Sequence, residues 1–187
     1  MHKIIISLML IFSILFLSSC SVGGLRAEML NRDNDDAKAN ARLEQVLEAI
    51  KKKDKENLKS MFSRQALKDA DNFDSSMEDL LDFFQGKVDS WKKSSGPTVF
   101  ESNDHGRKKK EVNSYYYVNT DKQKYFFLLQ DYTVDTEHPD NVGLYLLLLV
   151  KAENREKIYD GDQKILYDGD KEVFHAGIYL PLKDSQK

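Results

Sequence analysis

The spacing of apolar residues changes along this chain of 187 residues. An almost unbroken apolar run covers residues 4–17, and apolar positions then recur every three or four residues up to about residue 84. From Trp91 onward they alternate with polar positions. A period near 3.6 predicts amphipathic helices, whereas a period of two predicts strands. We therefore expect an apolar leader, a helical part and a part made of strands, in that order.

The helical part is expected to hold several short helices. One is indicated by four apolar residues at i, i+3, i+4 and i+7, namely Leu43, Val46, Leu47 and Ile50. Asp36 is placed to cap this helix, and Asp54 and Ser63 are placed to cap two shorter ones. Ser75 and Glu78 have the spacing of a capping box, which predicts a last helix from Ser75.

Strand candidates follow, separated by Asn, Asp, Gly and Pro residues. They cover residues 98–102, 109–118, 124–135, 143–152 and 178–180. Residues 144–150 are apolar without a break, which predicts a central strand buried on both faces. Because most connections are short, we expect an antiparallel meander. The predicted fold class is α+β, with N-terminal helices packed on one face of a curved antiparallel sheet.

The first twenty residues have the features of a secretory signal. A basic start precedes the apolar run of about 14 residues, which is shorter than the roughly 20 needed to span a bilayer. Two serines then precede Cys20, the only cysteine. This order resembles bacterial lipoprotein precursors, which implies a diacylglycerol on Cys20 and an extracytoplasmic domain anchored to the cell membrane. A plain signal-anchor with an incidental cysteine is the alternative.

This interpretation divides the chain into three parts. Residues 1–19 are the expected signal peptide, residues 20–36 the lipidated Cys20 with a flexible tether, and residues 37–187 a single domain. With 32% charged residues and a net charge of -3, the chain is not expected to bind nucleic acid. A basic run at residues 107–110 fits either a membrane contact or a charged strand edge, and we favour the edge.

Two sets of residues resemble known families. Residues 43–63 follow the pattern of an amphipathic helix, a basic-Asp turn and a short helix ending in an aromatic residue and a serine. This pattern resembles nuclear transport factor 2-like (cystatin-like) domains, in which helices close the concave face of a bent sheet into a cone. Residues 82–86, 132–135, 139–145 and 177–181 resemble uncharacterised lipoproteins of Gram-positive bacteria that share domain of unknown function 5104. The resemblance implies a fold and a cell surface, but no activity.

No catalytic residue or metal ligand is assigned. Catalytic relatives in the wider superfamily place Asp, His or Tyr inside the cone, and this chain offers six such residues: His105, Asp131, Tyr132, Asp135, His138 and His175. No two of them have a spacing diagnostic of catalysis. The acidic loop at 135–141 lacks the ligand pattern of a calcium loop and has ordinary turn chemistry. We therefore expect no metal and no cofactor.

The candidate pocket is placed at the cone. Trp91 lies between the last helix and the long strands, and on a strand Tyr115 and Tyr117 share one face while Tyr116 takes the other. The candidate lining residues are Trp91, Tyr115, Tyr117, Asp135 and His138. The function we favour is non-catalytic binding of a small molecule, a peptide or an envelope protein. A cone-pocket isomerase, dehydratase or hydrolase and an immunity-type lipoprotein remain alternatives, and the oligomeric state stays open.

Overall fold

The computed structural model describes residues 20–158, 166–168 and 171–181. The expected signal peptide at residues 1–19 lies outside the described residues. Contacts divide the chain into two units, residues 1–38 and 39–187, and the second contains all the described strands. Among the described helices, none is both long and apolar enough to cross a membrane.

The first helix begins earlier than predicted. Helix α2 runs from Cys20 to Lys52, so Asp36 is an interior residue and not an N-cap, and residues 20–36 are helical instead of an irregular tether. Residues 25–30 are mostly strong helix formers. Extending an existing helix by one residue also avoids the cost of a new nucleus, so the Gly and Asp residues do not end it.

Three short helices follow: α3 (Lys55–Ser60), α4 (Arg64–Asp69) and α5 (Phe73–Phe83). Two predicted caps are confirmed, because the side chains of Asp54 and Ser63 accept hydrogen bonds from the backbone N–H of Asn57 and Ala66, each at 3.0 Å. The capping box at Ser75 is wrong, since α5 begins at Phe73. Phe73 is buried against the ring of Phe62 at 4.8 Å, and this packing places the first turn.

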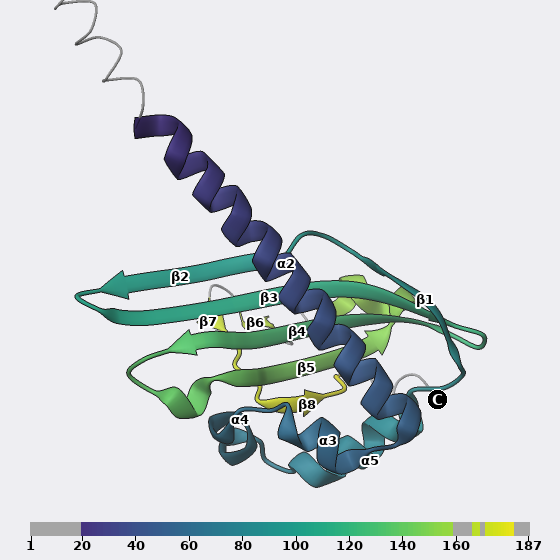
Figure 1. Cartoon of the computed structure of the whole chain (residues 1–187). Coiled ribbons are helices and arrows are strands. Elements are labelled where there is room, and N and C mark those ends of the chain that lie inside the picture. Colours follow the sequence, from purple (N-terminus) through teal and green to yellow (C-terminus); the bar gives the residue numbers. More distant parts are fainter. Residues whose placement is uncertain (1–19, 159–165, 169–170, 182–187) are drawn as a thin grey trace, which may run out of the picture. The chain divides into compact units, whose positions relative to one another are not determined.

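Within the described residues, six strands form one sheet (Figure 1). They are β1 (Val88–Lys93), β2 (Thr98–Asp104), β3 (Arg107–Thr120), β4 (Lys124–Asp135), β5 (Gly143–Lys151) and β8 (Gly177–Tyr179). Their order is β1-β3-β4-β5-β8, and β2 pairs with the first half of β3. The short elements η1 (Pro139–Asn141) and η2 (Ala152–Ile158) flank β5, and β6 (Tyr167–Asp168) pairs with β7 (Lys171–Glu172).

The α+β class is confirmed, with one correction to the sheet. Helices precede a curved, open sheet as predicted, but β8 runs parallel to β5, so the sheet is mixed and not wholly antiparallel (Figure 1). The chain passes through η2 and the β6–β7 hairpin before it adds β8 at the sheet edge. That longer connection makes a parallel strand possible.

The two faces of the sheet carry different cores. Residues from α2 to α5 pack on one face, called here the helix-side face, against side chains that include Tyr116, Phe127 and Leu147. The other face, called the outer face, has a smaller core formed by Phe126, Leu128, Leu146, Leu148, Val150 and Ile158. Strand β5 contributes to both, which confirms the prediction that residues 144–150 are buried on both faces.

Candidate functional site

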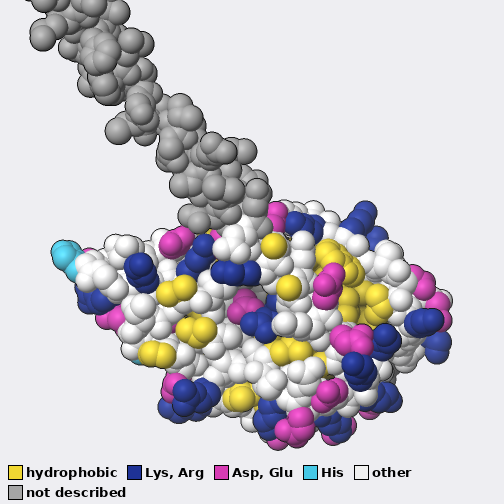
Figure 2. All heavy atoms as spheres, viewed as in Figure 1, with side chains coloured by type: hydrophobic (Ala, Val, Ile, Leu, Met, Phe, Trp, Pro, Cys, Tyr) yellow, Lys and Arg dark blue, Asp and Glu magenta, His cyan; other side chains and the backbone are white. Residues whose placement is uncertain are grey.

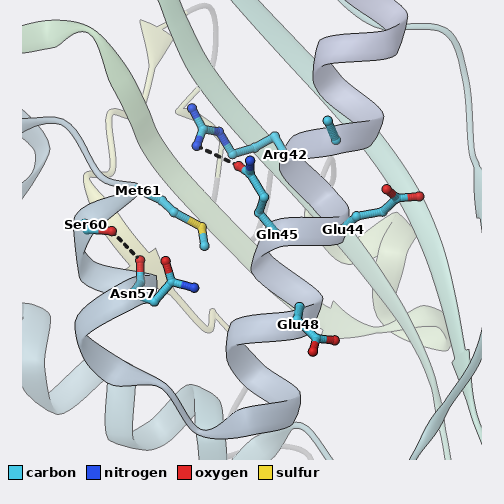
Figure 3. Close-up of a pocket in the computed structure, with 8 residues that line it drawn as sticks. Arg42, Glu44, Gln45, Glu48, Asn57, Ser60 and Met61 are labelled. Atoms are coloured by element: carbon cyan, nitrogen blue, oxygen red, sulfur yellow. Dashed lines mark hydrogen bonds between the residues drawn. The ribbon is translucent and has the colours of Figure 1, made fainter.

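An open recess of about 620 Å³ lies beside α2 and α3 and is called here the α2–α3 groove (Figure 3). Helix α2 supplies five of its lining residues, and the remainder come from α3 and the residue that follows it. The lining consists of Ala41, Arg42, Glu44, Gln45, Glu48, Asn57, Ser60 and Met61.

Local sequence explains why polar side chains gather there. Ala41, Gln45 and Glu48 are spaced i, i+4 and i+7, so they share the side of α2 that faces away from its apolar stripe. The backbone of Met61 is fixed to β5, because the Leu144 N–H donates to the Met61 carbonyl at 2.9 Å. The groove therefore has polar walls and a buried thioether at its base.

Arg42 joins the groove to the sheet. Its Nε donates to Asp131 Oδ2 at 2.5 Å, and its Nη1 donates to Gln45 Oε1 at 3.3 Å. The Arg42 side chain is 26% exposed and that of Asp131 is 14% exposed. Asp131 alternates along β4 with Phe127 and Leu129, which pack on the helix-side face, so its carboxylate is directed toward α2. Among the described residues, the bonds to Asp131 and Gln45 are the hydrogen bonds of the guanidinium, which has five N–H donors in all.

The other polar groups of the groove are held by local contacts. Glu48 pairs with Lys52 at 3.0 Å and with Lys51 at 3.3 Å, and these lysines lower the pKa of its carboxyl. Ser60 Oγ donates to the Asn57 carbonyl at 2.7 Å, as Figure 3 shows. The groove thus presents amide, hydroxyl and guanidinium groups. Such groups can form hydrogen bonds with the N–H and C=O groups of a polypeptide backbone.

The helix-side face of the sheet, in contrast, is filled. Leu43, Leu58 and Leu80 from the helices are fully buried against it. The Tyr116 hydroxyl donates to Asn40 Oδ1 at 3.1 Å. The Tyr125 hydroxyl donates to the Phe83 carbonyl at 3.0 Å, and burial raises the pKa of this phenol. These phenols serve the packing between helices and sheet.

Residues 45–152 match the domain of unknown function DUF5104, which is more than half of the chain. The chain belongs to the DUF5104 family. The match begins within the groove segment of α2 and ends just after β5. No curated protein sequence matches the chain significantly.

Within this DUF5104 domain, three of the pocket residues expected from sequence lie on two faces of the sheet. Trp91 packs on the helix-side face, with its ring 5.5 Å from that of Tyr116. Tyr115 and Tyr117 contact the outer core, where the ring of Tyr117 lies 5.5 Å from that of Phe126. The alternation of the three tyrosines is as predicted, and it separates Tyr115 and Tyr117 from Trp91.

Asp135 and His138 lie together in the turn after β4. Asp135 is 6% exposed and accepts hydrogen bonds from the backbone N–H of Glu137 and His138 and from Asn141 Nδ2. Burial alone would raise the pKa of Asp135, but these hydrogen bonds lower it overall. The side chain of His138 is 74% exposed. The carboxylate therefore organises this turn.

The α2–α3 groove contains none of the five residues expected from sequence. Its polar residues follow the ordinary pattern of a solvated helix side, so no signal in the sequence distinguishes them. Asp131 was one of the six residues considered as possible catalytic residues inside the cone. Its partner Arg42 lies far away in sequence and was not considered. Only the tertiary structure brings them together.

Proposed function

We propose that this DUF5104 protein is a lipid-anchored extracytoplasmic lipoprotein whose domain binds a peptide or another polar ligand and performs no chemistry on it. We further propose that the domain has a nuclear transport factor 2-like fold, as its helices and bent sheet suggest. The observation that carries the proposal is that apolar side chains fill the helix-side face while the recess lies outside, beside α2 and α3.

The electrostatics of the groove support binding over catalysis. General acid–base catalysis needs a titratable group that is free to exchange a proton with the substrate. Of the three ionisable groups that line the groove, Arg42 and Glu48 are each engaged by an opposite charge, and the third is Glu44. Acidic and basic side chains are also mixed over the face in Figure 2, which favours local polar contacts over recognition of one strongly charged ligand.

The proposed anchor rests on Cys20 and its surroundings. An apolar run followed by small residues and one cysteine suits transfer of a diacylglycerol to the thiol. Two acyl chains hold a protein stably on a membrane, whereas one chain binds reversibly. Residues 1–19 would be removed, and the domain would remain on the outer side of the cell membrane of a Gram-positive bacterium.

Fatty-acid labelling in cells tests the anchor. We expect the parent protein to incorporate a labelled palmitate and Cys20→Ala to incorporate none, because no other residue carries a thiol. The variant should accumulate as a larger precursor or appear in the medium. Equal labelling of the two proteins would show that the anchor proposal is wrong.

Site-specific photocrosslinking in cells tests the groove. A photoreactive residue at position 57, inside the groove, should give an adduct of defined mass, and one at position 122, in the exposed β3–β4 turn, should give none. Gln45→Ala should reduce the adduct at position 57, because it removes an amide from the facing wall. Equal adducts at both positions, or none at position 57, would contradict binding in the groove.

A further inference from the structure

A basic patch lies on the outer face of the sheet, where β1, β3 and the start of β4 run side by side (Figure 1). Tyr117 contacts the outer core, and Lys92 is directly opposite it on β1. One row further along, Asn119 is opposite Ser90 on β1 and Lys124 on β4. Directly opposite residues share a face of the sheet, as do residues i and i+2 of one strand. These five residues therefore form one surface, called here the β1–β3–β4 patch.

Tyr117 has a lysine on each side. Lys124 Nζ lies 4.5 Å from the centroid of the Tyr117 ring, and Lys92 stands on the strand at the other side of Tyr117. Both lysines are exposed. Neighbouring strands are about 4.8 Å apart, so β1 and β4 are separated by about 10 Å, a distance that two long side chains can close from opposite sides. The two ammonium groups can thus meet one ligand above the phenol ring.

The positive charge of the patch is not neutralised by its surroundings. Within the described part of the chain, neither Lys92 nor Lys124 forms an ion pair. Residues 87–93 and 119–124 together carry five lysines and two aspartates, and Asp121 already accepts a hydrogen bond from the Lys87 N–H at 2.7 Å. Element η2, which packs on the same face through Ile158, carries two acidic and two basic residues. The charge of the patch therefore favours an anionic ligand.

Two hydroxyl groups add uncharged donors beside the lysines. Asn119 Nδ2 donates to Ser90 Oγ at 3.0 Å, so Ser90 is an acceptor there and keeps its own hydrogen to donate. Among the described residues, no hydrogen bond engages the Tyr117 hydroxyl. A phosphate group has several oxygens that accept hydrogen bonds at once, and lysine is a common partner of phosphate. Two ammonium groups and two hydroxyls on one surface suit such a group.

We propose that the β1–β3–β4 patch binds the phosphate group of a phosphate ester. Lys92 and Lys124 neutralise the phosphate from two sides, and the hydroxyls of Tyr117 and Ser90 donate hydrogen bonds to its oxygens. A soluble ester and a lipid headgroup both carry this group, and the experiment below distinguishes them. The patch lies on the face of the sheet away from the helices, so it is separate from the α2–α3 groove and is tested independently of it.

The test uses the full chain in micelles of a nonionic detergent, with backbone amide chemical shifts as the measure of binding. Glycerol phosphate is titrated at constant ionic strength, with sodium chloride as the matched salt. We expect saturable shifts at residues 90–92, 117–119 and 124 with glycerol phosphate and none with chloride. Shifts that appear only when phosphatidylglycerol is added to the micelles assign the phosphate to a lipid headgroup. Equal shifts with chloride, or no shifts there with either phosphate compound, overturn the proposal.

Variants separate this patch from a general effect of charge. Lys92→Gln and Lys124→Gln should each weaken phosphate binding by at least about threefold, because each removes a charge-assisted hydrogen bond. Tyr117→Phe keeps the ring, removes the hydroxyl and should weaken binding by about twofold. Lys109→Gln is the matched control, since Lys109 Nζ also lies over a ring, that of Tyr132 at 5.0 Å, but outside the patch. It should bind normally, and an equal loss in Lys109→Gln and the two patch variants overturns the proposal.

Discussion

Arg42 and Asp131 are separated by 89 residues in sequence and meet in a partly buried ion pair between α2 and β4. The pair links the wall of the α2–α3 groove to the sheet. Its position matters because removal of one partner leaves a charge that water solvates incompletely. In this respect it differs from the exposed pair of Arg64 with Asp140, whose side chains are 82% and 58% exposed.

We expect Arg42→Ala to lower the free energy of unfolding by about 2 kcal/mol, because Asp131 then loses its charge-assisted hydrogen bond. Arg64→Ala is the matched control and should change it by less than about 0.5 kcal/mol. Urea denaturation measures both free energies. A double-mutant cycle that combines Arg42→Ala with Asp131→Asn should show that the two side chains stabilise each other. Equal effects of the two arginine variants would contradict this account of the pair.

The hydroxyl of Tyr145 makes the stability of the fold depend on pH. Burial, and then the hydrogen bond from its hydroxyl to Asp69 Oδ2 at 3.0 Å, raises its pKa to about 12. The folded state thus keeps the phenol proton above the ordinary pKa of 10, where the unfolded state has lost it. The stability that this contributes is fully present below pH 10 and is lost as the pH rises toward 12.

Tyr145→Phe should therefore reduce the loss of stability between pH 10 and 12. Urea midpoints across this range measure the effect for the parent and the variant. Part of the loss should remain in both proteins, because burial also raises the pKa of Tyr125 and Tyr179. Identical pH dependence of stability in the two proteins would show that the pKa of Tyr145 is not raised.

At the scale of elements, helix starts depend on both side-chain caps and packing. Ser63 caps α4 through a hydrogen bond to the Ala66 N–H, as its position in sequence predicts. Ser75 has an equally favourable sequence context but lies inside α5. Burial of Phe73 determines that helix start, because apolar burial is worth more than one exposed cap.

This difference gives a paired prediction. Ser63→Ala should lower the free energy of unfolding by about 1 kcal/mol, since a buried cap is lost. Ser75→Ala should lower it by less than about 0.5 kcal/mol, because no capping bond is removed. Thermal and urea unfolding of the two variants provide the measurement. A larger loss for Ser75→Ala than for Ser63→Ala would reverse the assignment of the caps.

Strand β1 shows why one element escaped prediction. It contains only Val88 and Trp91 as apolar residues, and its pairing with β3 shifts register between Val88 and Ser90. A bulge places two residues opposite one, so the alternation that indicates a strand is interrupted. Strand β3 keeps its alternation over most of its length, and β4 has an unbroken apolar run at residues 125–129. Both were predicted.

At the scale of the whole molecule, both faces of the sheet have their own core. The helices cover one face, and the outer face packs against Ile158 of η2. The described residues also form an open recess beside α2 and α3 and an exposed strand β2.

A truncated protein that begins at Asp36 should unfold in one cooperative transition, because residues 39–187 form one compact unit. It contains no cysteine, and the Asp135 carboxylate is already satisfied by hydrogen bonds in its turn. Neither a reductant nor a chelator should therefore change its melting temperature. Calorimetry measures this, and a fall of several degrees with chelator would restore a metal site in the 135–141 loop.

The sequence by itself determined what depends on near neighbours. Periods of 3.6 and two predicted the helices and most strands, the cap positions of Asp54 and Ser63 predicted two helix starts, and the unbroken apolar run predicted the doubly buried β5. These signals reflect interactions within a few residues, such as side-chain direction and capping bonds. The resemblance to DUF5104 followed from short motifs in the same way and is confirmed.

The tertiary structure alone decided which distant residues meet. The packing of α2 on the helix-side face of β4 brings Arg42 to Asp131. The alternation of β3 sends Tyr115 and Tyr117 to the face opposite Trp91, and β8 joins in parallel. A shift of one residue in register reverses which side chains face the helices. Local periodicity does not encode that register, so the filled helix-side face, the α2–α3 groove and the β1–β3–β4 patch emerged only when the helices and strands were packed together.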